Sequence, residues 1–184
     1  ASTEEDTPVF LTGLGGALVD SDGSEVLTYQ ISGVPAGVSF GAGTDLGGGV
    51  WSFTAGQMTG GVWFTPPLNW HGTINTMTIT AYATEGENGS VATNTASITI
   101  TVDAQADQPL ISGTTTGLED TTINFGQNVA VSLYDTDGSE SLTSITVTMP
   151  GGLVPGYVVS GGATVTDLGG GVYSISGPAV GMQA

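Results

Sequence analysis

The chain contains the acidic stretch Asp20-Ser21-Asp22-Gly23-Ser24-Glu25, which returns as Asp135-Thr136-Asp137-Gly138-Ser139-Glu140 and is called here the DxDGSE motif. A Glu-Asp-Thr tripeptide precedes each copy, and Leu-Thr, a Pro-Gly segment and Asp-Leu-Gly-Gly-Gly-Val follow it. The two copies are 115 residues apart (positions 20 and 135), which is the size of a domain rather than of a solenoid unit. The sequence therefore predicts tandem domains.

Between these motifs, apolar residues recur at every second position. Residues 27–32 and 96–102 alternate in this way, which is typical of half-buried strands. Two short strands are expected within residues 9–19, and Gly47-Gly48-Gly49 predicts the turn of a hairpin. With no helical window, the pattern predicts an all-β fold of antiparallel β-sandwiches.

The short polar segment 103–109 ends in a proline and is the expected boundary between domains. It divides the chain into a first repeat, residues 1–107, and a second repeat, residues 108–184. The second repeat lacks equivalents of residues 63–102, so we expect it to be incomplete and to be completed by other parts of a longer chain or by a partner.

The composition is acidic to an unusual degree. The 184 residues include 17 Asp and Glu, one His and neither Lys nor Arg, giving a formal net charge of −17. Such a chain repels phosphates and lacks the residues that usually contact them, which argues against nucleic-acid binding. No apolar run is long enough for a membrane-spanning helix, so membrane insertion is not expected. Because no basic side chain neutralises the clustered carboxylates, cations must come from solvent or the pKa values must rise.

Each DxDGSE motif places three carboxylates within six residues, with a glycine to turn the backbone. Carboxylate and hydroxyl oxygens are the ligands that Ca²⁺ prefers, so calcium is the expected cofactor. The alternative is that these residues are solvated turn residues, because Asp and Gly favour turns whatever they bind. The candidate metal ligands are Glu5, Asp6, Asp20, Asp22, Glu25, Asp103, Asp107, Glu119, Asp120, Asp135, Asp137 and Glu140.

The order of motifs resembles the bacterial cadherin-like and Ig-like tandem repeats that form the extender regions of large RTX-type surface adhesins. The resemblance rests on Glu-Asp-Thr, DxDGSE with Leu-Thr, the segment 64–73 (FTPPLNWHGT) and a Thr- and Ile-rich strand that ends at Val102-Asp103. It covers the first repeat and the available part of the second. The linker departs from the cadherin pattern at residues 105–107, where Gln, Ala and Asp stand in place of Asn, Asp and Asn.

In the cadherin pattern an early Glu, a linker Asp and the DxD loop of the next domain bind Ca²⁺ together. The resemblance places Glu5, Asp103, Asp135 and Asp137 in these roles, with Asp6, Asp107 and Glu140 as further candidates. By the same logic Asp20 and Asp22 would face a preceding domain, and Glu85 is a further candidate on that side.

The function expected from this resemblance is that of a non-enzymatic, calcium-stiffened extender on the bacterial cell surface, which supports adhesion or biofilm formation. Its partners would be neighbouring repeats of the same chain. The alternative is a sugar- or peptide-binding module, with a ligand-binding domain inserted near residue 184, and an exposed cluster of Trp51, Trp63 and Trp70 would favour it. A carbohydrate-active enzyme would instead need two carboxylates facing each other across a cleft. Asp45, Asp167 and His71 are expected to be turn residues.

Overall fold

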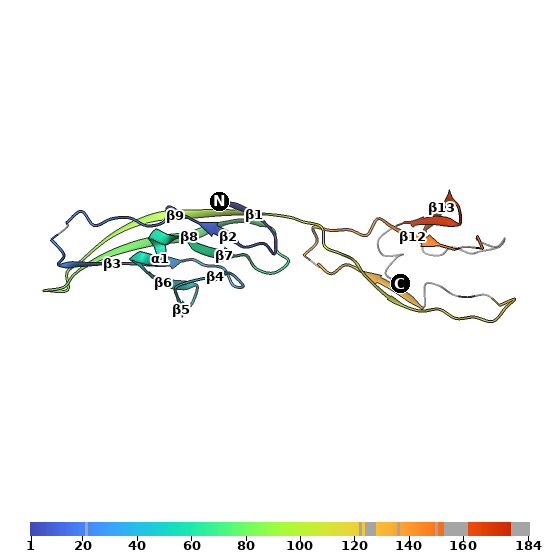
Figure 1. The fold of residues 1–184 in the computed structure, drawn as a ribbon, viewed down its shortest axis with the longest axis horizontal. Coiled ribbons are helices and arrows are strands. Elements are labelled where there is room, and N and C mark those ends of the chain that lie inside the picture. Colours follow the sequence, from blue (N-terminus) through green and yellow to red (C-terminus); the bar gives the residue numbers. More distant parts are fainter. Residues whose placement is uncertain are drawn as a thin grey trace. The chain divides into compact units, whose positions relative to one another are not determined.

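The computed structural model describes residues 1–20, 22–121, 123, 128–135, 137–149, 151–152 and 162–177. The chain forms two compact units, Ala1–Gln105 and Ala106–Ala184, called here the first and the second unit. The described residues are mostly strand, arranged in several sheets, so the all-β prediction is confirmed (Figure 1). The expected turns at Pro155-Gly156, and Ser21 and Thr136 of the motifs, lie outside the described residues.

The first unit has a six-stranded sheet in the order β1-β9-β8-β3-β6-β5. Its strands are β1 (Ser2–Glu4), β3 (Glu25–Ser32), β5 (Thr44–Gly47), β6 (Val50–Thr54), β8 (Gly72–Glu85) and β9 (Val91–Asp103). A smaller sheet has the order β2-β7-β4, with β2 (Val9–Leu11), β4 (Ser39–Phe40) and β7 (Val62–Thr65). β7 ends where Pro66 and Pro67 follow, because proline cannot donate to a ladder.

One hydrophobic core joins the two sheets. Its fully buried members include Ile31, Met77 and Ile100 of the large sheet and Val62 and Phe64 of the small sheet. The core also contains the Phe40 ring, which makes edge-to-face contacts with Trp51, Phe53 and Phe64 at centroid distances of 5.3, 5.4 and 5.8 Å. The predicted alternation matches burial at Tyr29 and Ile31 of β3 and at residues 98, 100 and 102 of β9, whereas Ala96 is exposed.

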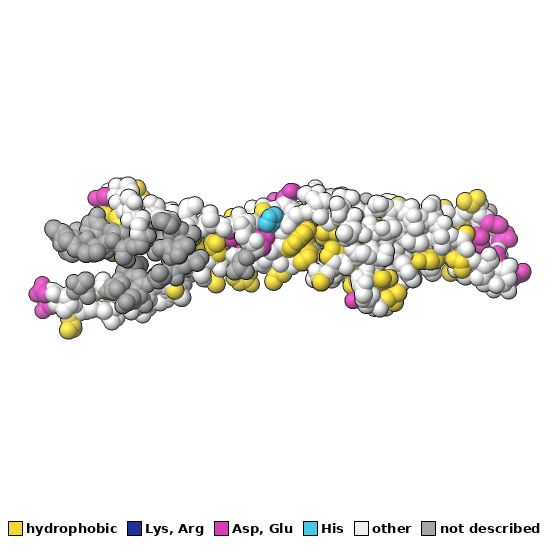
Figure 2. Space-filling view, turned by 180° about the vertical axis from the view of Figure 1, so that it is seen from behind, with side chains coloured by type: hydrophobic (Ala, Val, Ile, Leu, Met, Phe, Trp, Pro, Cys, Tyr) yellow, Lys and Arg dark blue, Asp and Glu magenta, His cyan; other side chains and the backbone are white. Residues whose placement is uncertain are grey.

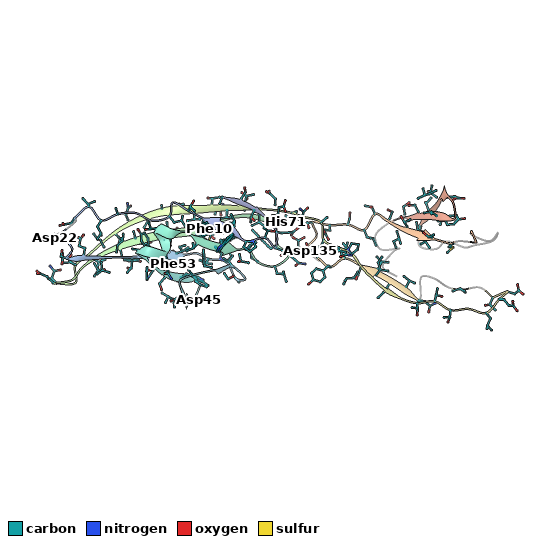
Figure 3. The ribbon with its side chains drawn as sticks, in the orientation of Figure 1. Phe10, Asp22, Asp45, Phe53, His71 and Asp135 are labelled. Atoms are coloured by element: carbon teal, nitrogen blue, oxygen red, sulfur yellow. The ribbon has the colours of Figure 1, made fainter. Side chains whose placement is uncertain are left out.

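The expected hairpin forms in both units with the same local geometry. Gly47, Gly48 and Gly49 all have positive φ (81°, 63° and 74°), which glycine adopts without steric cost. The carboxylate of Asp45 accepts a hydrogen bond from the Gly47 N–H at 2.8 Å, and Asp167 accepts one from the Gly169 N–H at 2.8 Å. Asp45 lies in β5 (Thr44–Gly47) and Asp167 in a strand at residues 164–169, so both stand at the strand end before the turn rather than in the turn itself, as Figure 3 shows for Asp45. That neither of them binds a cation stays a prediction.

The structure differs from the sequence prediction in three places. Residues 2–4 precede the first expected strand but form β1, and this strand pairs with β9 in parallel rather than antiparallel orientation. Residues 17–19 form no strand, and Val19 is fully exposed. A short helix, α1 (Ala55–Gly60), follows β6, where Thr54 and Gln57 form a capping box.

The second unit contains the two-stranded sheet β10-β11, from β10 (Leu110–Gly113) and β11 (Val129–Ser132). A three-stranded sheet has the order β12-β14-β13, from β12 (Ser144–Thr148), β13 (Thr164–Gly169) and β14 (Val172–Ser176). Among the described residues of this unit, Val131 is the one buried hydrophobic side chain, at 7% exposure. That the second repeat is incomplete stays a prediction.

Candidate cation sites

Glu5 lies directly after β1, in a turn that the backbone fixes tightly. Its N–H donates to the carbonyl oxygen of Asp103 at 2.9 Å, so the turn lies beside the end of β9. Asp6 follows in the left-handed conformation (φ 55°), and its carboxylate accepts a hydrogen bond from the Asn69 N–H at 2.7 Å. Three predicted ligand residues, Glu5, Asp6 and Asp103, are thus brought to one end of the first unit.

The Glu5 side chain is only 5% exposed, although it carries a charge. Its Oε1 accepts a hydrogen bond from the Gln105 N–H, whereas its Oε2 is buried and has no hydrogen-bond partner among the described residues. Burying a carboxylate costs several kcal/mol unless an opposite charge or hydrogen bonds compensate it, and no Lys or Arg exists here to do so. The oxygen therefore requires a proton or a cation. Solvent can supply either, and a ring nitrogen of His71 lies within 4.8 Å of a Glu5 carboxylate oxygen, so that this imidazole is a further proton source.

The side-chain Oδ1 of Asn69 is a second oxygen that is buried without a hydrogen-bond partner among the described residues. Asn69 was not among the ligands predicted from the sequence. The residue adopts a positive φ of 51° in the loop between β7 and β8, next to the Asp6 carboxylate. Its place in an Asn-Trp-His-Gly turn after two prolines was the available signal, because Asn tolerates this conformation.

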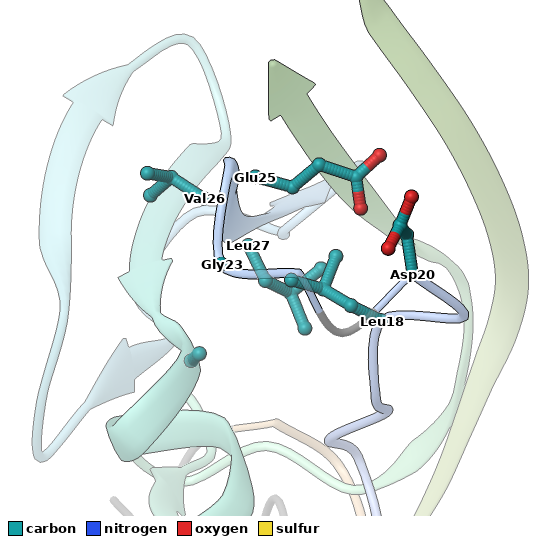
Figure 4. Close-up of a pocket in the computed structure, with 7 residues that line it drawn as sticks. Leu18, Asp20, Gly23, Glu25, Val26 and Leu27 are labelled. Carbon is teal, nitrogen blue, oxygen red and sulfur yellow. The ribbon is translucent and has the colours of Figure 1, made fainter. Parts of the chain in front are cut away.

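At the opposite end of the first unit, the DxDGSE loop enters β3. The Asp20 carboxylate accepts a hydrogen bond from the Asp22 N–H at 3.1 Å, and the Asp22 carboxylate accepts one from the Ser24 N–H at 2.8 Å. Figure 2 shows Asp and Glu side chains gathered at this end, and Figure 3 shows Asp22 there. The loop, the start of β3 and Ala55 of α1 line an open pocket of about 570 Å³, and the carboxylates of Asp20 and Glu25 lie near each other at its edge (Figure 4).

Glu25 and Glu85 are directly opposite each other on β3 and β8, and like charges in such a pair are destabilising. The Ser24 hydroxyl lies 3.0 Å from Oε2 of Glu85. The same hydroxyl and the Ser24 N–H hold the pKa of the Asp22 carboxyl below its ordinary value. Because a hydroxyl carries one proton, that of Ser24 can donate to Asp22 or to Glu85 at one time but not to both.

The second DxDGSE loop, after β11, repeats the turn of the first. The Asp135 carboxylate accepts hydrogen bonds from the Asp137 N–H at 2.8 Å and from the Ser139 hydroxyl at 3.4 Å. Asp137 accepts one from the Ser139 N–H at 2.7 Å. The two loops differ in burial at the first Asp of the motif. Asp135 is only 2% exposed, whereas Asp20 is an exposed residue.

The Glu140 carboxylate, at the end of the second DxDGSE loop, is held in the same way as that of Glu5. Its Oε1 accepts a hydrogen bond from the Asp107 N–H, and its Oε2 is buried without a partner among the described residues. The structure thus associates Asp107, Asp135, Asp137 and Glu140 within the second unit. Gln105 ends the first unit and Asp107 lies near the start of the second, so each glutamate binds an amide of its own unit.

The remaining candidates are not brought to such a cluster. Asp120 has the left-handed conformation of Asp6 (φ 60° against 55°), which shows that the Glu-Asp-Thr turn is repeated, but Glu119 and Asp120 are both exposed. Trp51 and Trp70 pack against the core, and only Trp63 is exposed, beside Phe10 at a centroid distance of 5.1 Å. The three tryptophans therefore do not form the exposed cluster that would favour sugar binding.

Comparison with protein-family models, with curated proteins and with solved structures finds no match to this chain. In the part of the chain that the structure describes, no helix has the length and apolar character needed to cross a membrane. The functional argument consequently rests on the chemistry of the sites themselves.

Proposed function

We propose that this chain is a non-enzymatic extender module of a bacterial cell-surface adhesin, stiffened by Ca²⁺. The observation that carries the proposal is the buried carboxylate of Glu5, one oxygen of which has no partner among the described residues, in a chain without Lys or Arg. A cation bound from solvent would coordinate this oxygen and neutralise the carboxylate without a basic side chain. The repeated motifs and their resemblance to cadherin-like and Ig-like β-sandwiches supply the rest of the argument.

The donor set favours calcium over other metals. Glu5 and Asn69 offer a carboxylate and an amide oxygen, and the DxDGSE loops offer further carboxylates. Zinc prefers nitrogen and sulfur ligands, whereas the chain has no Cys and a single His. Ca²⁺ takes six to eight oxygen ligands in flexible geometry, which loops of Asp, Glu and Asn can provide.

We propose that calcium acts on the linker, which is the boundary segment 103–109 defined above, and that Glu5 and Glu140 carry this effect. Glu5 holds the Gln105 amide and Glu140 holds the Asp107 amide, while each keeps a second oxygen for a cation. A cation at each glutamate, with Asp103, Asp135 and Asp137 as further donors, would restrict the linker to one conformation. Because the cation binds the folded form, it would also stabilise each unit.

The acidic end formed by Asp20, Asp22, Glu25 and Glu85 would be a further calcium site, completed by whatever repeat lies beside it. The opposed Glu25 and Glu85 support this assignment, because the pair is unfavourable without a cation. An extracellular position on the bacterial surface suits such sites, since extracellular modules bind Ca²⁺ at about 10⁻⁴ to 10⁻³ M.

Isothermal titration of the full chain with CaCl₂, together with small-angle scattering, tests the proposal. We expect binding in the range of about 10⁻⁴ to 10⁻³ M, and a larger and better defined maximum dimension with Ca²⁺ than with chelator. NaCl at matched ionic strength is the control, because it screens the carboxylates without occupying a site. Equal effects of NaCl and CaCl₂, or scattering that does not change on chelation, would overturn the proposal.

The positions of the sites are tested by paired substitutions. Asp135→Asn with Asp137→Asn should abolish the calcium-dependent change in scattering. Asp20→Asn with Asp22→Asn removes the same charge from the other end of the first unit and should leave that change intact. If both pairs act alike, the linker is not where calcium acts.

A further inference from the structure

The strand β9 is paired unequally on its two sides. Along one side it pairs with β8 from Val91 to Val102. On the other side β1 pairs only with Thr101, Val102 and Asp103, and the Ala1 amino group extends the contact to the Thr99 carbonyl. Residues 91–97, called here the open edge, therefore have a neighbouring strand on one side only among the described residues.

The direction of the backbone groups on the open edge follows from the hydrogen bonds at its two ends. The Glu85 N–H donates to the Ser90 carbonyl, so Ser90 and every second residue after it face β8. At the other end, Thr99 and Thr101 bond to Ala1 and face away from β8. The same alternation makes Val91, Thr93, Thr95 and Ser97 direct their N–H and C=O groups outward. The Asn94 side chain accepts a hydrogen bond from the Thr95 N–H at 2.9 Å, so this outward N–H has a local partner.

The open edge is also uncharged in a chain that is otherwise acidic. No ionisable side chain occurs from Asn88 to Val102, although the chain carries a net charge of −17. All seven residues of the open edge are exposed. Natural edge strands are usually protected by charges, proline or bulges, and residues 91–97 contain no charge and no proline. Two copies of this chain can therefore approach at this edge without placing carboxylates against each other.

Antiparallel pairing of the open edge with itself satisfies all of its outward groups. With a twofold axis at Asn94, Val91 lies opposite Ser97 of the second copy, and Thr93 lies opposite Thr95. Each of these residues directs its polar groups outward, so each pair can exchange the two hydrogen bonds of an antiparallel ladder. The register ends before Thr99, where β1 begins to cover the strand. A two-residue shift of register would leave outward groups at one end without partners.

We propose that the open edge of β9 docks against the same edge of a second copy, joining two six-stranded sheets into one. The interface is isologous, as a twofold axis requires. It is a single pair of strands, well below the roughly 1,000 Å² of a stable interface, so the association is weak and appears at about 0.1–1 mM protein. It does not depend on calcium, and so it stands apart from the extender function.

Sedimentation equilibrium of the full chain tests this inference, in chelator and about 0.3 M NaCl to screen the net charge. The weight-average mass should rise toward that of a dimer as concentration increases. Thr95→Glu puts a charge on the open edge and should weaken association at least tenfold. Thr80→Glu is the matched control, since Thr80 is paired with Thr95 but lies one strand inside the sheet, and it should leave association unchanged.

Two further variants separate edge pairing from other contacts. Thr93→Pro removes an outward N–H while leaving the β8 ladder in place, so it should abolish dimers. Asn94→Ala frees the Thr95 N–H and should tighten them. Circular dichroism checks that each variant folds, and if Thr93→Pro does not, Thr95→Glu decides. A monomer at 1 mM, a dimer that Thr95→Glu leaves intact, or association through another protein strand rather than a second copy would overturn the inference.

Discussion

Replacing Glu5 by Gln separates the electrostatic role of the side chain from its structural role. The amide oxygen of Gln can still accept the hydrogen bond from the Gln105 N–H, but the buried charge is removed. In chelator the wild-type chain bears the cost of a buried carboxylate charge that no cation compensates, which is on the order of several kcal/mol. The Gln variant leaves a neutral amide NH2 group at the same place, which costs only about 1–3 kcal/mol. We therefore expect Glu5→Gln to be as stable as the wild type or more stable when calcium is absent.

With calcium the order should reverse. At about 10 mM Ca²⁺ and a dissociation constant of about 10⁻⁴ to 10⁻³ M, binding to the folded form contributes about 1.4 to 2.7 kcal/mol. For a domain of about 100 residues this raises Tm by roughly 6 to 20 °C. Glu5→Gln should lose at least half of that increase, because the variant lacks the buried anionic ligand.

Differential scanning calorimetry of the full chain, with and without Ca²⁺, measures both effects in the first unit. Asp45→Asn is the control, because it removes one carboxylate from an exposed hairpin that is expected to bind no cation. The reasoning would be refuted if Glu5→Gln kept the full calcium-dependent increase in Tm. It would also be refuted if the variant lost several kcal/mol in chelator, since the buried carboxylate would then stabilise the fold without any cation.

Three other substitutions are expected to have smaller effects. Glu25→Gln relieves the repulsion with Glu85 and should raise the free energy of unfolding in chelator by about 0.2–1 kcal/mol in urea titrations, and a loss of stability would contradict the pairing. The lowered pKa of Asp22 stabilises the fold fully above the unfolded pKa of about 3.9, and this contribution is lost as pH falls through the folded pKa. Ser24→Ala removes the hydroxyl but keeps the N–H, so it should raise that pKa in an NMR titration, and an unchanged value would exclude the Ser24 hydroxyl as a cause. Thr54→Ala removes the cap of α1 and should cost about 0.5–2 kcal/mol by thermal unfolding, whereas no change would mean that the cap is not needed.

Much of the fold follows from local pattern. β3 and β9 were predicted because alternate residues face the core, and the hairpins because Asp-Leu-Gly-Gly-Gly fixes a turn without help from distant residues. The helix α1 has only six residues, too few for an apolar period to appear, and its one signal was Thr54 with Gln57 three residues later. The parallel pairing of β1 with β9 joins residues about a hundred positions apart, which no local pattern encodes.

The candidate sites divide in the same way. The turns within each DxDGSE loop are local, and the motif predicts them. The burial of Glu5 and Asn69 depends on long-range packing, so sequence could select Glu5 only through its resemblance to cadherin-like repeats and did not select Asn69. The different exposure of Asp20 and Asp135, which occupy the same motif position, could not be predicted for the same reason.

The parallel pairing of β1 with β9 also governs how the first unit resists tension. When Ala1 and Gln105 are pulled apart, β1 is drawn backward and β9 forward, so the two strands are loaded in shear. The bonds from Ala1 to Thr99 and Thr101 (3.1 and 3.0 Å) and from Glu5 to Asp103 (2.9 Å) lie across that direction and share the force. They must rupture together, whereas an antiparallel hairpin pulled from its open end unzips one bond at a time. Three residues of strand thus act as a mechanical clamp over the core.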